Sequence, residues 1–175
     1  MGVLPLAALG QCIWITGPSA GGKSTLATAV GAKLNREVIH LDQLRFRPST
    51  WDEREDGEFL QGVTRAAAGE SWVIEGNYFS FLGGRLERAT GMISLSSPRL
   101  GNYGRYLSRS LGRSKRVGTV AGAGEGPNWP MTKWILLEEP RGRERKRQML
   151  LDGGKPVVLT SSFAELKALY RAWEL

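Results

Sequence analysis

The chain contains few of the residues on which disulfide-linked and zinc-binding proteins depend. There is one cysteine, Cys12, and one histidine, His40, among 175 residues. A single cysteine cannot form an internal disulfide or supply a zinc motif, and this fits a reducing compartment, so we expect a cytoplasmic protein. His40 lies inside a predicted strand, and we assign it no catalytic role. No apolar run is long enough to cross a membrane, and we expect no membrane partner.

Acidic residues are missing from one long part of the chain. Lys and Arg together number 24 and Asp and Glu number 17, which gives a net charge of +7. Residues 88–124 include seven basic residues and no acidic one, and a second basic cluster spans 141–147. Such blocks suit polyphosphate, nucleic acid or an acidic surface, because a merely solvated face normally mixes both signs. The length favours a single domain over residues 1–175.

Residues 17–25 have the form G-x-x-x-x-G-K-S of a phosphate-binding loop. Glycines let the backbone turn its N–H groups toward an anion. Lys23 can neutralise the outer phosphates, and Ser24 offers a hydroxyl to Mg²⁺. An apolar strand over 11–16 precedes the loop, and the helix that follows points its positive end at the same phosphates. The predicted nucleotide-binding residues here are Gly17, Pro18, Ser19, Ala20, Gly21, Gly22, Lys23, Ser24 and Thr25.

Two acidic residues follow apolar segments that we predict to be strands. Asp42 follows residues 38–41, and Glu75 ends the apolar run that begins at 71. Ligands of open α/β sheets bind beyond the carboxyl ends of the strands, so both side chains should face the phosphates. We predict that Ser24, Asp42 and Glu75 hold Mg²⁺, the carboxylates through water. Asp42 would also orient the attacking group or accept its proton.

Basic residues occupy one stripe of a predicted helix. Arg105, Arg109 and Arg113 recur at every fourth position, and unpaired like charges in such a row destabilise a helix. An anion should therefore face them. The glycine-rich stretch that follows, about 112–132, is either disordered or a lid over the site. The acceptor of a phosphoryl group would be bound by residues of about 43–70.

Four more arginines are candidates for binding an acceptor phosphate, although each could equally be an ordinary surface residue. They are Arg45, Arg47, Arg85 and Arg88.

Apolar segments of strand length alternate with segments of helical periodicity along the whole chain. This alternation predicts an α/β protein with a parallel sheet covered by helices on both faces. The predicted strands are 11–16, 38–41, 71–75, 91–96 and 156–160. The first predicted helix follows the loop at 23, and the second begins at 49 or 50 and ends at 69. Two further predicted helices include 103–111 and 129–137, and the last begins at 161 or 162.

The loop, the signature His-Leu-Asp at 40–42, the segment 72–78 and the arginine-rich helix resemble adenylate-kinase-like P-loop proteins. The nearest likeness is to the topology-modulation-protein family, small bacterial proteins usually described as nucleotide kinases. The resemblance implies a nucleoside-monophosphate-kinase-like fold with five parallel strands, ATP and Mg²⁺ as cofactors, and a mobile lid. It also implies that lid arginines close over the phosphates, which here would be Arg109, Arg113 and Arg116. Glu75 and Ser96 stand where the family usually has Asp.

These features favour a Mg²⁺-ATP-dependent kinase that acts on a nucleotide or another small acceptor. Its catalytic residues would be Lys23, Asp42, Arg109 and Arg113. Two alternatives stay open: an ATP-dependent switch protein that contacts nucleic acid, and a small-metabolite kinase similar to shikimate or gluconate kinases. The charge favours the first alternative, but no nucleic-acid-reading motif supports it. We expect a monomer.

Overall fold

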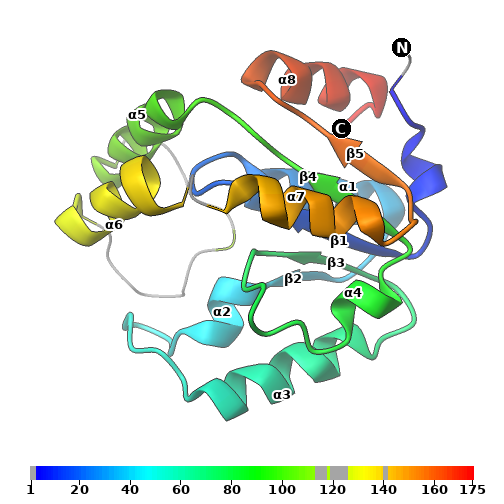
Figure 1. Ribbon diagram of the computed structural model, residues 1–175, viewed down its shortest axis with the longest axis horizontal. Helices are drawn as coiled ribbons and strands as arrows, with labels where there is room; N and C mark the ends of the chain where they lie inside the picture. Colours follow the sequence, from blue (N-terminus) through cyan, green and yellow to red (C-terminus); the bar gives the residue numbers. More distant parts are fainter. Residues whose placement is uncertain (1–2, 113–117, 119–125, 140–141) are drawn as a thin grey trace.

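A computed structural model of the protein describes residues 3–112, 118, 126–139 and 142–175. Within these residues the chain forms a five-stranded sheet in the order β2-β3-β1-β4-β5, and every pairing is parallel (Figure 1). The predicted α/β class and parallel sheet are confirmed. The strands are β1 (Cys12–Thr16), β2 (Val38–His40), β3 (Trp72–Glu75), β4 (Gly91–Ser94) and β5 (Val157–Leu159).

Helices cover both faces of the sheet, because alternate residues of each strand point to opposite sides. On one face, Ile13 and Ile15 of β1 pack against α1 (Lys23–Leu34) and α8 (Phe163–Ala172). On the other face, Cys12 and Trp14 pack in a core with residues of α3 (Asp56–Ala67) and α7 (Arg143–Asp152). Both cores meet at β1, which is buried throughout. The loop that follows β1 is therefore anchored at the centre of the molecule.

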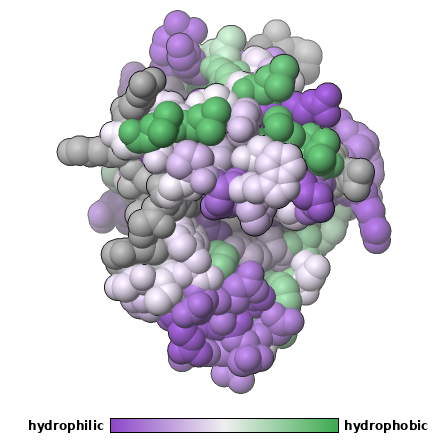
Figure 2. All heavy atoms as spheres, turned by 90° about the vertical axis from the view of Figure 1, so that its left-hand side faces the viewer, coloured by the Kyte–Doolittle hydropathy of each residue, from purple (hydrophilic) through white to green (hydrophobic). Residues whose placement is uncertain are grey.

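A group of helices extends beyond the carboxyl edge of the sheet, on the left in Figure 1. Figure 2 shows this side of the molecule. Apolar residues gather in its upper part, whereas its lower part, around the α2–α3 connection, is hydrophilic. Within the described residues, no helix is long and apolar enough to span a bilayer. The remaining helices are η1 (Leu6–Leu9), α2 (Leu41–Arg45), α4 (Arg85–Arg88), α5 (Arg99–Ser110), α6 (Trp129–Lys133) and the π-helical η2 (Trp134–Glu138).

The second predicted helix begins later than expected. The sequence predicts a start at residue 49 or 50, but α3 begins at Asp56. Residues 46–53 instead form a loop closed by an antiparallel bridge between Phe46 and Glu53, and the ring of Trp51 packs edge-on against Phe46. This aromatic contact within the loop keeps Trp51 outside the helix that the sequence predicts.

Other boundaries also differ from the prediction. Leu41 begins a short helix, α2, instead of ending a strand, and β4 ends at Ser94 instead of 96. Leu111, at the end of the predicted helix segment 103–111, is 59% exposed. The short helix α4 and the basic helix α7 have no counterpart in the prediction. A four-residue helix is too short for periodicity to reveal, and α7 has only one buried side chain, Leu150.

A buried arginine fixes the turn after β3. Arg85 has no exposed surface, its guanidinium lies 4.6 Å from the ring centre of Trp14, and burial lowers its pKa to about 10. Its Nη2 donates to the carbonyl oxygens of Asn77 and Tyr78, at 2.6 and 2.7 Å. Arg85 therefore holds the segment that follows Glu75 in place beneath the sheet edge.

We expect the variant Arg85→Met to lower the free energy of unfolding by about 2 kcal/mol, because two inward-facing carbonyl oxygens lose their donor. Urea denaturation followed by circular dichroism measures this change. Arg65→Met on exposed α3 surface is the control and should change it by less than about 0.5 kcal/mol. Equal stability of the Arg85 variant and the wild type would contradict this role.

Candidate phosphate-binding site

The predicted phosphate loop connects β1 to α1. Gly17 and Gly22 have φ angles of 141° and 102°, which favour glycine. A Cβ on Gly17 would lie 2.7 Å from the Cβ of Leu95, so the loop also needs glycine there for space. Ala20 adopts φ 57° between them. The backbone thus turns sharply before α1, whose first residues line a cavity.

Asn77 fastens the loop to the neighbouring strand. The Gly17 N–H donates to Asn77 Oδ1 at 3.1 Å, and Asn77 Nδ2 donates to the Gly17 carbonyl oxygen at 3.0 Å. This pair of bonds satisfies both backbone groups of the first loop glycine. Asn77 belongs to the segment that carries the family resemblance, but the sequence alone assigns it no role. The structure makes it a support of the loop.

Glu75 is the buried carboxylate at the centre of the site. It is 3% exposed, and its Oε1 accepts from the Ser24 hydroxyl at 3.0 Å and lies 2.9 Å from Nδ1 of His40. Burial alone raises its pKa, but the His40 hydrogen bond, the charge of Lys23 and the Ser24 hydroxyl outweigh burial and leave the pKa lowered. Glu75 is therefore an ionised carboxylate beside Ser24.

His40 is a site residue that the sequence analysis missed. It ends β2 and is 8% exposed, and its ring nitrogen positions Glu75. The parallel pairing of β2 with β3 places His40 directly opposite Glu75. Residue spacing gives no signal for this contact, because 35 residues separate the two side chains.

The side chains present fit a magnesium ion. An octahedral site with Mg–O distances of about 2.0–2.1 Å places neighbouring ligand oxygens about 2.9 Å apart. The Ser24 hydroxyl and the Glu75 carboxylate are 3.0 Å apart. Within the described residues, no cluster of three His, Cys, Asp or Glu could hold a metal alone. Magnesium in phosphoryl-transfer sites usually has one or two protein ligands and completes its shell with phosphate and water. The Ser24–Glu75 separation and the lack of a three-ligand cluster among the described residues are therefore both compatible with magnesium.

Asp42 lies in the first turn of α2 and lines the same cavity as Lys23, Ser24 and Glu75. The Tyr78 hydroxyl donates to Asp42 Oδ1 at 2.7 Å. Burial first, and then the Asp42 charge, raises the pKa of Tyr78, so the phenol stays protonated and donates. The structure thus places Asp42 in the cavity, and the Tyr78 hydrogen bond orients its carboxylate.

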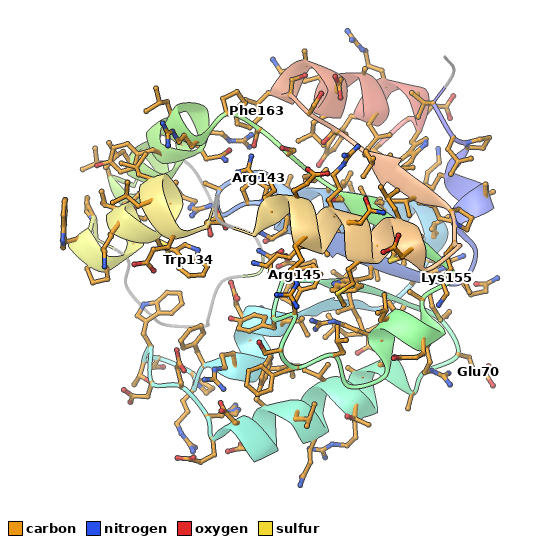
Figure 3. All side chains as sticks on the ribbon, viewed as in Figure 1. Glu70, Trp134, Arg143, Arg145, Lys155 and Phe163 are labelled. Carbon is orange, nitrogen blue, oxygen red and sulfur yellow. The ribbon has the colours of Figure 1, made fainter. Side chains whose placement is uncertain are left out.

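Arginines of α5 face the other side of the cavity. Burial, and then the charge of Arg109, lowers the pKa of Arg105, whose guanidinium packs 4.7 Å from the ring centre of Phe163 (Figure 3). Burial also lowers the pKa of Arg109, and its buried Nε has no hydrogen-bond partner among the described residues. Two neighbouring cations that are partly stripped of water favour an anion between them.

The remaining predicted arginines, Arg113 and Arg116, lie outside the described residues. Of residues 113–125 the structure describes Gly118, where an added Cβ would collide with the His40 ring. Gly118, one residue of the segment that we predict to be a lid, therefore lies against the His40 ring.

A cavity of about 1030 Å³ extends from the loop to an aromatic wall. Phe46, Trp51 and Phe81 line it on the side of α2, and Trp134 lines it from η2. Figure 3 shows the Trp134 side chain on the side of η2 that faces α2. A cavity of this volume can hold both a nucleotide and a second small molecule.

The arginines considered for an acceptor phosphate have other contacts. Arg45 forms ion pairs with Glu53 and Asp56 and packs on two aromatic rings. Arg47 pairs with Glu58 at 3.6 Å. Arg85 and Arg88 donate to backbone carbonyl oxygens. These contacts favour the structural interpretation of all four side chains.

Glu139 is a second residue that the sequence analysis missed. Its Oε1 accepts from the Ser19 N–H at 2.7 Å and from the Ser19 hydroxyl at 2.9 Å, and the residue is 7% exposed. A negatively charged side chain thus binds directly to the predicted phosphate loop. The chain separation of 120 residues explains why no local pattern reveals it.

Comparisons with known proteins agree with this geometry. A family model of adenylylsulphate kinase matches residues 9–46, which include β1, the loop and α1. A curated tRNA dimethylallyltransferase from Parvibaculum lavamentivorans is 36% identical over 69 residues, and the match covers 34% of this chain and 22% of that protein. These sequence matches are confined to part of the chain.

The structural likeness covers nearly the whole chain. A gluconokinase from Sinorhizobium meliloti has a TM-score of 0.54 at 18% identity, and the match covers 94% of this chain and 90% of that one. A shikimate kinase from Acinetobacter baumannii, in complex with shikimate, has a TM-score of 0.52 at 15% identity, with 96% of both chains covered. The fold is therefore that of P-loop kinases, while membership of the topology-modulation-protein family stays a prediction.

We expect Glu75→Gln to remove a pH-dependent part of the stability. Because folding lowers the Glu75 pKa, the carboxylate stabilises the protein above the ordinary pKa of about 4.3 and loses this effect as the pH falls through the lowered value. The stability gap between wild type and variant should therefore shrink in acid. Urea unfolding at several pH values measures it, with Glu70→Gln on the surface (Figure 3) as the control. A gap that does not change with pH would contradict the lowered pKa.

Proposed function

We propose that this chain is a kinase that transfers the outer phosphoryl group of Mg²⁺-ATP to a hydroxyl group of a small molecule. The observation that carries the proposal is the convergence of the phosphate loop, the Ser24–Glu75 pair and Asp42 on one cavity. The loop and Ser24 would bind the nucleotide and its metal, and Asp42 would face the acceptor. The kinase fold supports this arrangement.

In the proposed reaction the bond between the outer phosphorus and the bridging oxygen of ATP breaks, and a bond from the acceptor oxygen to phosphorus forms. Asp42 takes the proton of the acceptor hydroxyl, and ADP leaves with the bridging oxygen. Magnesium, when bound, would neutralise phosphate charge beside Ser24 and Glu75. Lys23 and Arg109 would stabilise the charge on the transferred group, and Arg113 and Arg116 would join them if the lid closes.

Lys23 has to move a short distance to do this. Its Nζ donates to the Pro18 carbonyl oxygen at 3.0 Å, within the loop itself. The ammonium group is therefore already held at the loop, and a phosphate oxygen can replace the carbonyl as its partner.

The shape of the cavity favours an acceptor with a flat or compact ring. Trp134 and Trp51, 41% and 36% exposed, contribute indole surface from the η2 side and the α2 side. Glu53 and Glu138 also line the cavity, which disfavours a phosphate group at that end. We therefore propose an acceptor without phosphate that carries a hydroxyl group. The gluconokinase and the shikimate kinase with similar folds are named for such hydroxyl compounds.

The direct test is a transfer screen read by mass spectrometry. The protein, Mg²⁺ and ATP are incubated with pooled nucleosides, nucleoside monophosphates, sugars and sugar acids, and Lys23→Ala is the control. We expect one pool member to gain a phosphoryl group with the wild type, and the Lys23 variant to fold normally and show no transfer. Transfer that is unchanged in a folded Lys23→Ala protein would remove Lys23 from the mechanism.

A second variant separates nucleotide binding from transfer. Asp42→Asn keeps the size of the side chain and its contact with Tyr78, but it cannot accept a proton. We expect the transfer rate to fall by about 100-fold or more while the ATP affinity stays within about threefold of the wild type. Asp152→Asn, exposed on α7, is the matched control and should transfer normally. Full activity of Asp42→Asn would show that another group takes the proton.

A further inference from the structure

The carboxylate of Glu139 occupies donors of the phosphate loop. Two donors of one residue, the Ser19 N–H and hydroxyl, bind the same oxygen of Glu139. Charge-assisted hydrogen bonds of this kind are among the stronger contacts that a loop can make. Ser19 also lines the cavity of about 1030 Å³ between the loop and the aromatic wall, which we call the main cavity. The loop therefore already holds an anion, and this anion belongs to the protein.

The contact lies at the part of the loop that the Lys23 ammonium reaches. The lysine of a phosphate loop contacts the outer phosphates. The Lys23 ammonium is bonded to the carbonyl oxygen of Pro18, the residue before Ser19. The negative charge of Glu139 thus lies beside the residue that the Lys23 ammonium contacts, and the outer phosphate gives ATP more negative charge than ADP.

The segment that carries Glu139 is built to present it. Glu139 follows the π-helical turn η2, and its N–H donates to the carbonyl oxygen of Trp134 at 2.9 Å. The wider π-helical turn changes the facing of successive side chains, and such turns are frequent at functional sites. Glu138 lines the main cavity and pairs with Lys133, whereas Glu139 lines a small cavity behind the loop.

Basic residues of α7 line the two cavities that Glu138 and Glu139 line. Arg143, Lys146 and Arg147 of α7 line the small cavity together with Glu139, and Lys146 also lines the main cavity. These cations share the small cavity with the Glu139 side chain. They would stabilise a phosphate group that took its place, so one anion can replace another without leaving the basic residues unpaired.

We propose that Glu139 is a gate that makes the loop discriminate between phosphate chains of different length. The outer phosphate of ATP displaces the carboxylate from Ser19 and thereby frees η2 from the loop. The carboxylate opposes ATP more strongly than ADP because like charges repel. Displacement couples nucleotide binding to the position of Trp134, which lines the acceptor end of the cavity. Glu139 acts through Ser19 and is a positioning residue.

The test compares ATP and ADP affinities by calorimetry for the wild type, Glu139→Gln and the control Glu144→Gln. The control removes the same charge from α7, where the Glu144 side chain is 78% exposed. We expect Glu139→Gln to bind ATP about tenfold more tightly and to change ADP affinity less, because the amide keeps the shape but not the charge. The control should bind both nucleotides as the wild type does.

Hydrogen–deuterium exchange of residues 126–139 gives a second measurement that does not depend on affinity. ATP should raise exchange in this segment of the wild type. Glu139→Ala, which lacks both hydrogen bonds, should show the raised exchange without ATP. Exchange that is insensitive to ATP and to this substitution would overturn the displacement of Glu139.

The inference rests on the proposed ATP binding, but different results would contradict the proposed function and the gate. If neither the wild type nor Glu139→Gln binds ATP, the proposed function fails. If both bind ATP with equal affinity, or the variant binds it more weakly, the proposed kinase stands and the gate is wrong, because Glu139 would then only support the shape of the loop.

Discussion

The buried carboxylate of Glu75 is the group on which the arrangement of the site depends. A carboxylate with 3% exposure is costly unless it is paired, and Glu75 is paired with residues from two other elements. His40 at the end of β2 and Ser24 at the start of α1 both contact its Oε1. The requirement to satisfy one buried charge therefore fixes β2, β3 and α1 relative to one another at the edge of the sheet.

The phosphate loop is held from two sides by contacts of different chemistry. On the side of β3, Asn77 satisfies both backbone groups of Gly17, and Arg85 fixes the backbone of Asn77. These contacts are neutral or involve a buried cation, and bound phosphate does not compete with them. On the other side, Glu139 holds Ser19 through negative charge. The loop thus has a permanent support and a contact that phosphate can replace.

The sequence predicted most of the framework and only part of the site. Strand-length apolar runs and the loop pattern identified β1, α1 and the parallel sheet, because these depend on local spacing and burial. The predicted residues Asp42 and Glu75 lie in the cavity because parallel strands end at one edge. The start of α3 was wrong, since the Phe46–Trp51 contact and the ion pairs of Arg45 favour a loop.

Contacts between distant segments explain what the sequence could not predict. His40 and Glu139 have site contacts across 35 and 120 residues, and the sequence alone assigns neither side chain a role. Arginine is equally ambiguous: Arg85 and Arg109 look alike in the sequence, but one holds backbone carbonyls and the other lines the cavity. Only the fold decides which cation is structural and which can face a phosphate.

We infer that the loop and the Ser24–Glu75 pair bind ATP together with Mg²⁺. Calorimetric titration of the wild type with ATP, in the presence of Mg²⁺ and again with excess chelator, tests this claim most directly. We expect one site per chain with clearly tighter binding when Mg²⁺ is present. The absence of ATP binding, or an ATP affinity that does not change with Mg²⁺, would contradict it.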